Sequence, residues 1–245
     1  MPQPLSSKPK ITQWREDESV LADHPKLATH IARVVAISSM IERQWAMMLC
    51  YIAKADPRAA VAMHQALSST TAQMAAFEAV AAVRLSDDSK LLFEAVKFAT
   101  KGYTRIRNEF CHHLWGDTYQ SPDVLLLIDP IVTINFIAGL EEPAVLRQAH
   151  SNGNRDFFER SKIVVYTEED LEGASAKMSN ALLIISSFAS VLRAELWDER
   201  NRQKSPLASL PSQRAEARAD LISFPAVSDA LQQLARRKPQ KPSSG

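Results

Sequence analysis

The chain has 245 residues, of which 46% are hydrophobic, so it is long enough for one large domain with a substantial core. Only six glycines and an aromatic fraction of 7%, together with frequent alanine, favour helices over sheets. The net charge of +1 argues neither for nor against a nucleic-acid partner, and two cysteines exclude a disulfide framework.

Targeting and membrane-spanning segments are not expected. The first ten residues, MPQPLSSKPK, lack the apolar core of a secretory signal. The longest apolar stretch, residues 124–140, is interrupted by Asp129, Pro130 and Asn135, so it is too broken to cross a bilayer. We therefore expect a soluble cytoplasmic protein that does not bind a membrane.

The first half of the chain predicts a helical bundle. Residues 1–22 are polar and contain prolines, and we expect a flexible arm there. Apolar residues then recur at steps of three and four from Leu27 to Ile52, which predicts a helix that starts near Pro25. Three more helices are expected to begin at the cap signals Asp56-Pro57, 68–71 and 86–89.

The fourth helix is predicted over residues 90–115, with Gly116 as its stop. Gly102 would lie in its interior, where glycine costs about 1 kcal/mol relative to alanine. Close approach of another helix would explain a glycine at this position.

Residues 117–165 differ from the rest. Val124–Ile128 is typical of a buried strand closed by Asp129-Pro130, and residues 131–137 and 162–166 are two further candidate strands. We expect a small sheet or hairpin beside the helices, although short apolar runs of this kind can also be buried helix.

The last long helix has the strongest start signal in the chain. Thr167 is the expected N-cap, Asp170 occupies the capping-box position, and Tyr166 and Leu171 can form a hydrophobic staple. From Arg200 onward the sequence contains nine basic residues and three acidic ones. The expected organisation is therefore a flexible arm (1–22), a helical domain (23–199), and a basic, mostly disordered tail (200–245) with a possible short helix over 227–237.

Chemistry is concentrated at the end of the fourth predicted helix, in the sequence RNEFCHHLWG from Arg107 to Gly116. An arginine can bind phosphate, and a histidine titrates near neutral pH. Positions 107 and 112 lie about 140° apart on a helix, whereas 108 and 112 are one turn apart. Asn108 could therefore orient His112, while the long Arg107 side chain reaches round to a phosphate.

This pattern resembles the HEPN superfamily of helical ribonucleases and RNA-binding domains. Its signature is an arginine, often followed by a polar residue, and a histidine after about four intervening positions, here Arg107, Asn108 and His112. The resemblance covers roughly residues 22–198 and implies a HEPN-like helical bundle with a small β insertion. Some toxin members carry a tyrosine two residues after the histidine, which a partner enzyme modifies. Here that residue is Leu114.

The resemblance implies an endoribonuclease that needs no metal or cofactor, in which the 2′-hydroxyl attacks the adjacent phosphate and leaves a 2′,3′-cyclic phosphate. His112 would act as general acid or base, and Arg107 would stabilise the phosphorane. Arg105 and His113 are weaker candidates for RNA contact. Family members often dimerise so that two motifs face one cleft, and the implied partners are RNA, a second copy of the chain, and an antitoxin or regulatory protein. By analogy, the setting would be a toxin or phage-defence system.

Other interpretations remain open. The domain could bind RNA or a protein without cleaving RNA, or Arg107 and His112 could be structural, because a helix C-terminus favours cations. Cys111 is expected in the core rather than as a nucleophile, and His113 as a helix-end residue. The other four histidines, His24, His30, His64 and His150, show no metal-ligand spacing.

Overall fold

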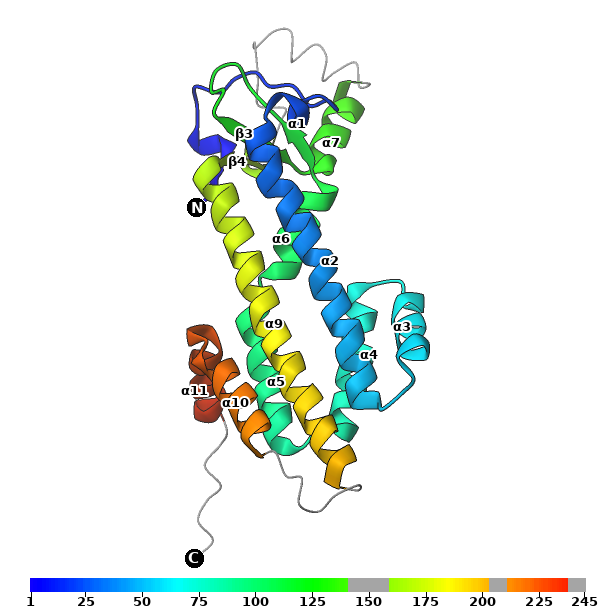
Figure 1. Ribbon diagram of the computed structural model, residues 1–245. Coiled ribbons are helices and arrows are strands. Elements are labelled where there is room, and N and C mark those ends of the chain that lie inside the picture. Colours follow the sequence, from blue (N-terminus) through cyan, green and yellow to red (C-terminus); the bar gives the residue numbers. More distant parts are fainter. Residues whose placement is uncertain (141–158, 203–210, 238–245) are drawn as a thin grey trace, which may run out of the picture. The chain divides into compact units, whose positions relative to one another are not determined.

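The computed structural model describes residues 1–140, 159–202 and 211–237. As the sequence predicts, the protein is mostly helical with a small four-stranded antiparallel sheet (Figure 1). The chain forms two compact units. Unit 1 comprises Met1–Ala36 and Tyr103–Met178, and unit 2 comprises Ile37–Gly102 and Ser179–Gly245. Two long helices, α2 (Pro25–Ala53) and α9 (Glu168–Arg202), contribute residues to both units.

Unit 1 is built on the sheet, whose strand order is β1-β4-β3-β2. All five residues of β3 are buried, and β3 pairs antiparallel with β4 in the register Leu126 to Val165. This confirms the two strands predicted around residues 124–128 and 162–166. The bounds of the strands are β1 Gln3–Pro4, β2 Leu114–Gly116, β3 Val124–Ile128 and β4 Ile163–Thr167, with a 3-10 turn η2 at Arg160–Lys162 before β4.

The strand predicted over residues 131–137 is wrong, because this segment forms helix α7 (Pro130–Leu140). The Asp129 carboxylate accepts a hydrogen bond from the Ile131 amide at 3.0 Å, and Pro130 is the first helical residue. An aspartate followed by proline is a helix start, since the side chain caps an amide and proline has no amide that needs a partner.

The flexible arm predicted for residues 1–22 is packed in unit 1. Leu5, Ile11 and Val20 are buried, and β1 adds an edge strand to β4. Leu5 and Ile11 join the apolar cluster of the sheet, which also contains Leu126 and Val165. Two short elements, η1 (Leu5–Ser7) and α1 (Val20–Asp23), belong to this segment. The few apolar residues of this segment are therefore buried at separate points along it.

Unit 2 is helical, with an aromatic core. Trp45 from α2 and Phe77 form an edge-to-face pair at 5.1 Å, and Phe93 lies 5.0 Å from Phe77 and 6.1 Å from Phe188 of α9. The predicted caps are confirmed, because the side chains of Asp56, Ser69 and Ser86 each accept hydrogen bonds from amides of the first turn. The three helices that they start are α3 (Pro57–Ala66), α4 (Thr70–Arg84) and α5 (Asp87–Thr100).

The predicted fourth helix is in fact two helices. α5 ends at Thr100, Lys101 and Gly102 form a turn, and α6 runs over Tyr103–His112. Gly102 is exposed, and a Cβ at this position would meet nothing within 4 Å. No other part of the described chain therefore approaches Gly102 closely, and the glycine marks the break instead.

The region from Arg200 onward is not mostly disordered. Residues 211–237 form α10 (Pro211–Ser223) and α11 (Pro225–Arg237), so the predicted short helix is confirmed and a second precedes it. Leu221, Val227 and Ala230 are fully buried, and α11 packs on α5. The predicted tail is thus an integral part of unit 2, while residues 203–210 and 238–245 lie outside the described chain.

Helix α9 begins as predicted. The Thr167 hydroxyl accepts a hydrogen bond from the Asp170 amide at 3.3 Å, and the Asp170 carboxylate accepts one from the Thr167 amide at 3.2 Å, which completes a capping box. By length and composition alone, its stretch Glu168–Glu195 could cross a membrane. Half of this apolar window is buried inside the protein.

Candidate functional site

Helix α6, which carries the Arg107 motif, is held in unit 1 by one aromatic side chain. Phe110 is the buried residue of this helix, and its ring packs edge-to-face against Trp115 at 5.2 Å and Tyr166 at 5.5 Å. Burial raises the pKa of Tyr166 to about 12, so its hydroxyl stays protonated at neutral pH. The packing of Phe110 fixes one side of α6 and leaves the opposite side exposed.

The exposed side of α6 carries most of the predicted site. Arg105, Asn108 and His112 are all exposed, and their spacing of three and four residues places them on one helical face. Arg107 and His113 are half-buried beside this face. We refer to the three exposed residues, together with the adjacent Arg107, as the α6 face. A substrate could therefore reach three polar side chains of the α6 face from solvent at once.

The hydrogen bonds of the α6 face differ from the expected ones. The Arg107 guanidinium donates through Nη1 to Oδ1 of Asn108 at 3.0 Å. Asn108 is thus paired with Arg107, and in the described chain the structure does not bring it into a hydrogen bond with the His112 ring. Arg105 pairs with Glu109 through Nε at 3.2 Å. The side chain of Arg105 is 82% exposed, so this ion pair is weak and can give way to a phosphate.

The two residues beside His112, Cys111 and His113, differ in how they compare with their predictions. Cys111 is exposed rather than in the core, since it lies on the outer side of α6, whereas Cys50 is buried. Burial raises the pKa of the Cys50 thiol. His113 follows the last residue of α6, and its amide donates to the Glu109 carbonyl at 3.0 Å, so it ends the helix as expected.

Gly116 has a role that the sequence did not show. It lies in β2 rather than at a helix end, and a Cβ at this position would stand 2.7 Å from the Arg15 carbonyl oxygen. The backbone of Arg15 exchanges hydrogen bonds with that of Asp117, at 3.0 and 3.1 Å. Glycine is therefore required for residues 11–24 to lie against the end of β2.

A charged cluster that sequence reasoning missed follows directly after β2. Arg15 donates to both carboxylate oxygens of Asp117, at 2.7 and 2.8 Å, and also pairs with Asp23. Nε2 of His24 lies 3.0 Å from Asp117 Oδ2. Arg15 and His24 lie 102 and 93 residues from Asp117 in the sequence and form no motif with it, so only the fold brings them together.

Asp117 is the centre of this cluster. Hydrogen bonds from Arg15 hold the pKa of Asp117 below its ordinary value, with a smaller contribution from His24 and against the opposing effect of burial. Asp117 is therefore a carboxylate at neutral pH, and the His24 nitrogen that faces it carries a proton. Both carboxylate oxygens of Asp117 accept hydrogen bonds from the N-terminal segment. These bonds hold that segment against the residue that follows β2.

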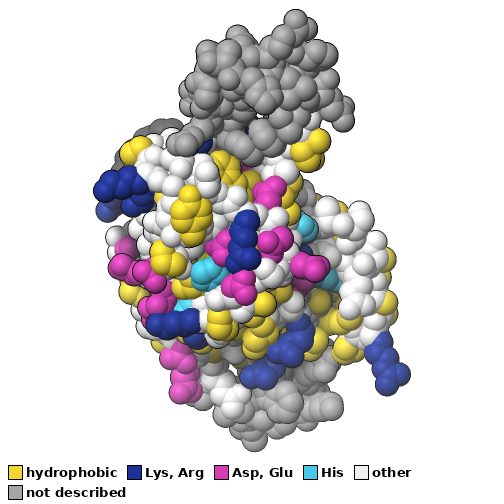
Figure 2. Space-filling view, turned by 90° about the horizontal axis from the view of Figure 1, so that it is seen from above, with side chains coloured by type: hydrophobic (Ala, Val, Ile, Leu, Met, Phe, Trp, Pro, Cys, Tyr) yellow, Lys and Arg dark blue, Asp and Glu magenta, His cyan; other side chains and the backbone are white. Residues whose placement is uncertain are grey.

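The described surface carries charges of both signs. Acidic, basic and histidine side chains are interspersed on the face seen in Figure 2, so this face has no large region of one charge sign. Among the residues that the structure describes, no group of three His, Cys, Asp or Glu side chains is arranged to hold a metal ion.

Comparison with known proteins adds no assignment. No protein-family model matches the chain, and neither a curated protein nor a solved structure shows significant similarity to it. The likeness to the HEPN superfamily thus depends on the Arg107, Asn108 and His112 motif and on the helical architecture alone.

Proposed function

We propose that the protein is a metal-independent endoribonuclease of the HEPN type, acting in the cytoplasm in a toxin or phage-defence system. The observation that carries this proposal is the α6 face, on which an ionisable imidazole and an amide share an exposed surface with arginines. His112 exchanges protons with the ribose 2′-hydroxyl or the leaving oxygen, and Arg107 and Arg105 neutralise the phosphate. The setting follows from family analogy.

Asn108 has a different role in this proposal from the one the sequence suggested. Its hydrogen bond with Arg107 holds the guanidinium near the exposed face of α6, instead of orienting the His112 ring. The amide therefore positions the phosphate-binding cation. His112 depends on the bound substrate, or on a second chain, for its own orientation.

The first prediction tests cleavage. Incubation of RNA with the protein in EDTA should give products that end in a 2′,3′-cyclic phosphate. His112→Ala should reduce the rate at least about 100-fold, which is the usual contribution of a general acid or base. Arg107→Ala should reduce it similarly. Cys111→Ser, on the exposed side of the same helix, is the matched control and should retain activity.

Two outcomes would redirect this assignment. Undiminished cleavage by correctly folded His112→Ala and Arg107→Ala proteins would exclude the α6 face as the active site. RNA binding without cleavage would favour the second candidate function, a non-catalytic HEPN-like module that binds RNA or a protein. The observation that favours this second function is that no described residue forms a hydrogen bond with the His112 ring.

A further inference from the structure

A groove in unit 2, between α9 and α10, is separate from the α6 face. It has a volume of about 610 Å³, which lies in the range of small-molecule sites. The two helices face each other here through small residues, Ser190 and Ala194 on α9 and Ala217 on α10. The groove exists because none of these side chains is large enough to fill the space between the helices.

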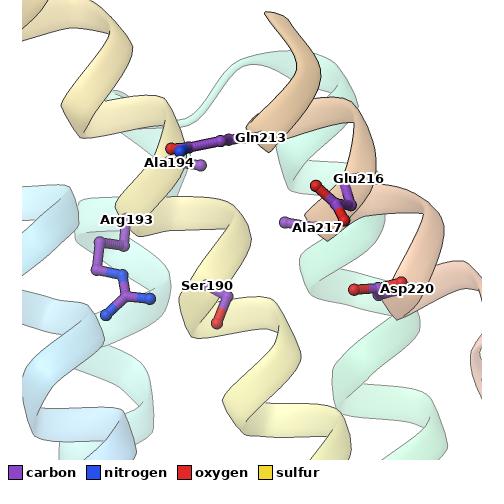
Figure 3. A pocket seen from close by; sticks show the side chains of 7 residues that line it. All are labelled: Ser190, Arg193, Ala194, Gln213, Glu216, Ala217 and Asp220. Carbon is purple, nitrogen blue, oxygen red and sulfur yellow. The ribbon is translucent and has the colours of Figure 1, made fainter. Parts of the chain in front are cut away.

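Glu216, Asp220 and Ser190 offer acceptors to the groove, and the Gln213 amide offers both an acceptor and a donor. Figure 3 shows the side chains of Glu216 and Asp220 pointing from α10 toward α9, whereas Arg193 points away from α10. The Ser190 hydroxyl donates its proton to the Ser186 carbonyl at 3.2 Å, so its oxygen is left to accept a hydrogen bond. The groove therefore favours a ligand that donates hydrogen bonds and carries positive charge.

The neighbouring acids of unit 2 are already neutralised. Glu195 accepts hydrogen bonds from Arg214 at 2.9 Å and from Ser89 at 2.5 Å, and Asp88 lies 3.7 Å from Arg218. Glu216 and Asp220, by contrast, form no ion pair with any residue in the described ranges. The charges of the two carboxylates that face the groove are thus open to a ligand.

The spacing of these carboxylates indicates the shape of the ligand. Residues 216 and 220 are one helical turn apart, a rise of about 6 Å along α10. An extended four-carbon chain also holds its two terminal nitrogens about 6 Å apart when its torsions are staggered. Its methylene groups would lie on Ala194 and Ala217, while each ammonium group meets one carboxylate.

We propose that this groove binds a linear aliphatic diamine or polyamine, with Glu216 and Asp220 holding two successive ammonium groups and Ser190 accepting a hydrogen bond. The site does not depend on ribonuclease activity, and it lies wholly within unit 2.

The test uses the full-length protein and 1,4-diaminobutane as the probe, with calorimetric titration at physiological salt. Diaminobutane should bind at one site per chain, about two- to fivefold more tightly than butylamine, because the second ammonium group adds an exposed ion pair. The neutral 1,4-butanediol should not bind. The double variant Glu216→Gln/Asp220→Asn should abolish binding of diaminobutane, because both ion pairs are lost, and Ala217→Leu should abolish binding by filling the groove.

Asp229→Asn, an exposed carboxylate on α11 that does not line the groove, is the matched control and should bind diaminobutane like the unmodified protein. Equal affinity for the monoamine and the diamine, or equal weakening by the control, would overturn the proposal, since either result would show only general attraction of counterions. Absence of saturable binding would overturn it as well. Thermal melts establish that each variant is folded.

Discussion

At the residue scale, the ion pairs of unit 1 differ in what they contribute. Arg105 and Glu109 meet at the surface, where solvent screens the pair and its contribution to stability is small. Asp117 is buried and accepts hydrogen bonds from Arg15 and His24. Removing the carboxylate would leave Arg15 without its bidentate partner and detach residues 11–24 from the end of β2.

Asp117→Asn should therefore destabilise the protein at pH 7 by on the order of 1–3 kcal/mol, the usual value for hydrogen bonds to a charged group, with the lower end favoured because Arg15 is 47% exposed. The pKa of Asp117 is lowered in the folded protein, so its contribution is fully present above the ordinary value of 3.8 and is lost as the pH falls through the lower folded value. The stability difference between Asp117→Asn and the unmodified protein should shrink below about pH 4.

Chemical denaturation at pH 7 and at pH 3 measures this difference. Asp123→Asn, an exposed carboxylate that precedes β3, is the control and should change stability little at either pH. A difference for Asp117→Asn that does not depend on pH would contradict the ionic role of Asp117.

The sequence predicted the positions of the site residues better than their partners. The sequence predicted that Asn108 and His112 lie one helical turn apart, and the structure places both on the exposed side of α6. The sequence could not show that Arg107 turns to Asn108, because a long side chain has several partners within reach. The pairing of Asp117 with Arg15 and His24 was beyond sequence reasoning, since it depends on how distant segments meet.

At the element scale, local signals succeeded where they were read consistently. Asp56-Pro57 was correctly taken as a helix start, and the same reasoning applied to Asp129-Pro130 would have found α7. The apolar run that follows favoured a strand only because short hydrophobic segments fit either structure. The break after α5 was similarly marked by Gly102, which ends a helix more readily than it continues one.

The helices after Arg202 are expected to stabilise unit 2. Ending the chain there removes α10 and α11, and with them the burial of Leu221, Val227 and Ala230. Each fully buried valine or leucine contributes about 1.5–3 kcal/mol. The melting temperature should therefore fall by on the order of 10 °C for a chain of this size. A shorter deletion, of residues 238–245 alone, is the control and should leave it nearly unchanged.

An unchanged melting temperature after the longer deletion would show that α10 and α11 do not stabilise unit 2. Composition alone had suggested that result, because arginine, serine and proline are common in disordered tails. The tail prediction gave this composition too much weight. In α11, apolar residues at helical spacing place Val227 and Ala230 on the buried side, and this pattern decides the structure.

At the scale of the whole molecule, the boundary between the units follows the break between α5 and α6. The α6 face belongs to unit 1, whereas the acidic groove and the aromatic core belong to unit 2. One chain provides a single Arg107 and a single His112. In-line attack on phosphate benefits from both a base and an acid, and a second motif in the same cleft would supply the group that one chain lacks.

We therefore predict a two-fold homodimer in which the α6 faces of two chains line one cleft. We expect the exposed residues Arg105, Asn108 and His112 to provide the surface that the partner chain approaches. Light scattering should give about twice the chain mass. Mixed Arg107→Ala and His112→Ala chains should cleave RNA faster than either variant alone, because a heterodimeric cleft keeps one arginine and one histidine. They should cleave more slowly than the unmodified dimer, because one imidazole then has to serve as both base and acid.

Mixing Arg107→Ala with a second batch of Arg107→Ala is the control, and it should restore nothing, since no cleft then contains an intact arginine. The shared cleft would be disproved by a protein that is monomeric at micromolar concentration and still cleaves RNA. In that event His112 would have to serve alternately as base and acid in a single chain. The pH profile would then show one ionising group in place of the bell-shaped dependence that a separate acid and base produce.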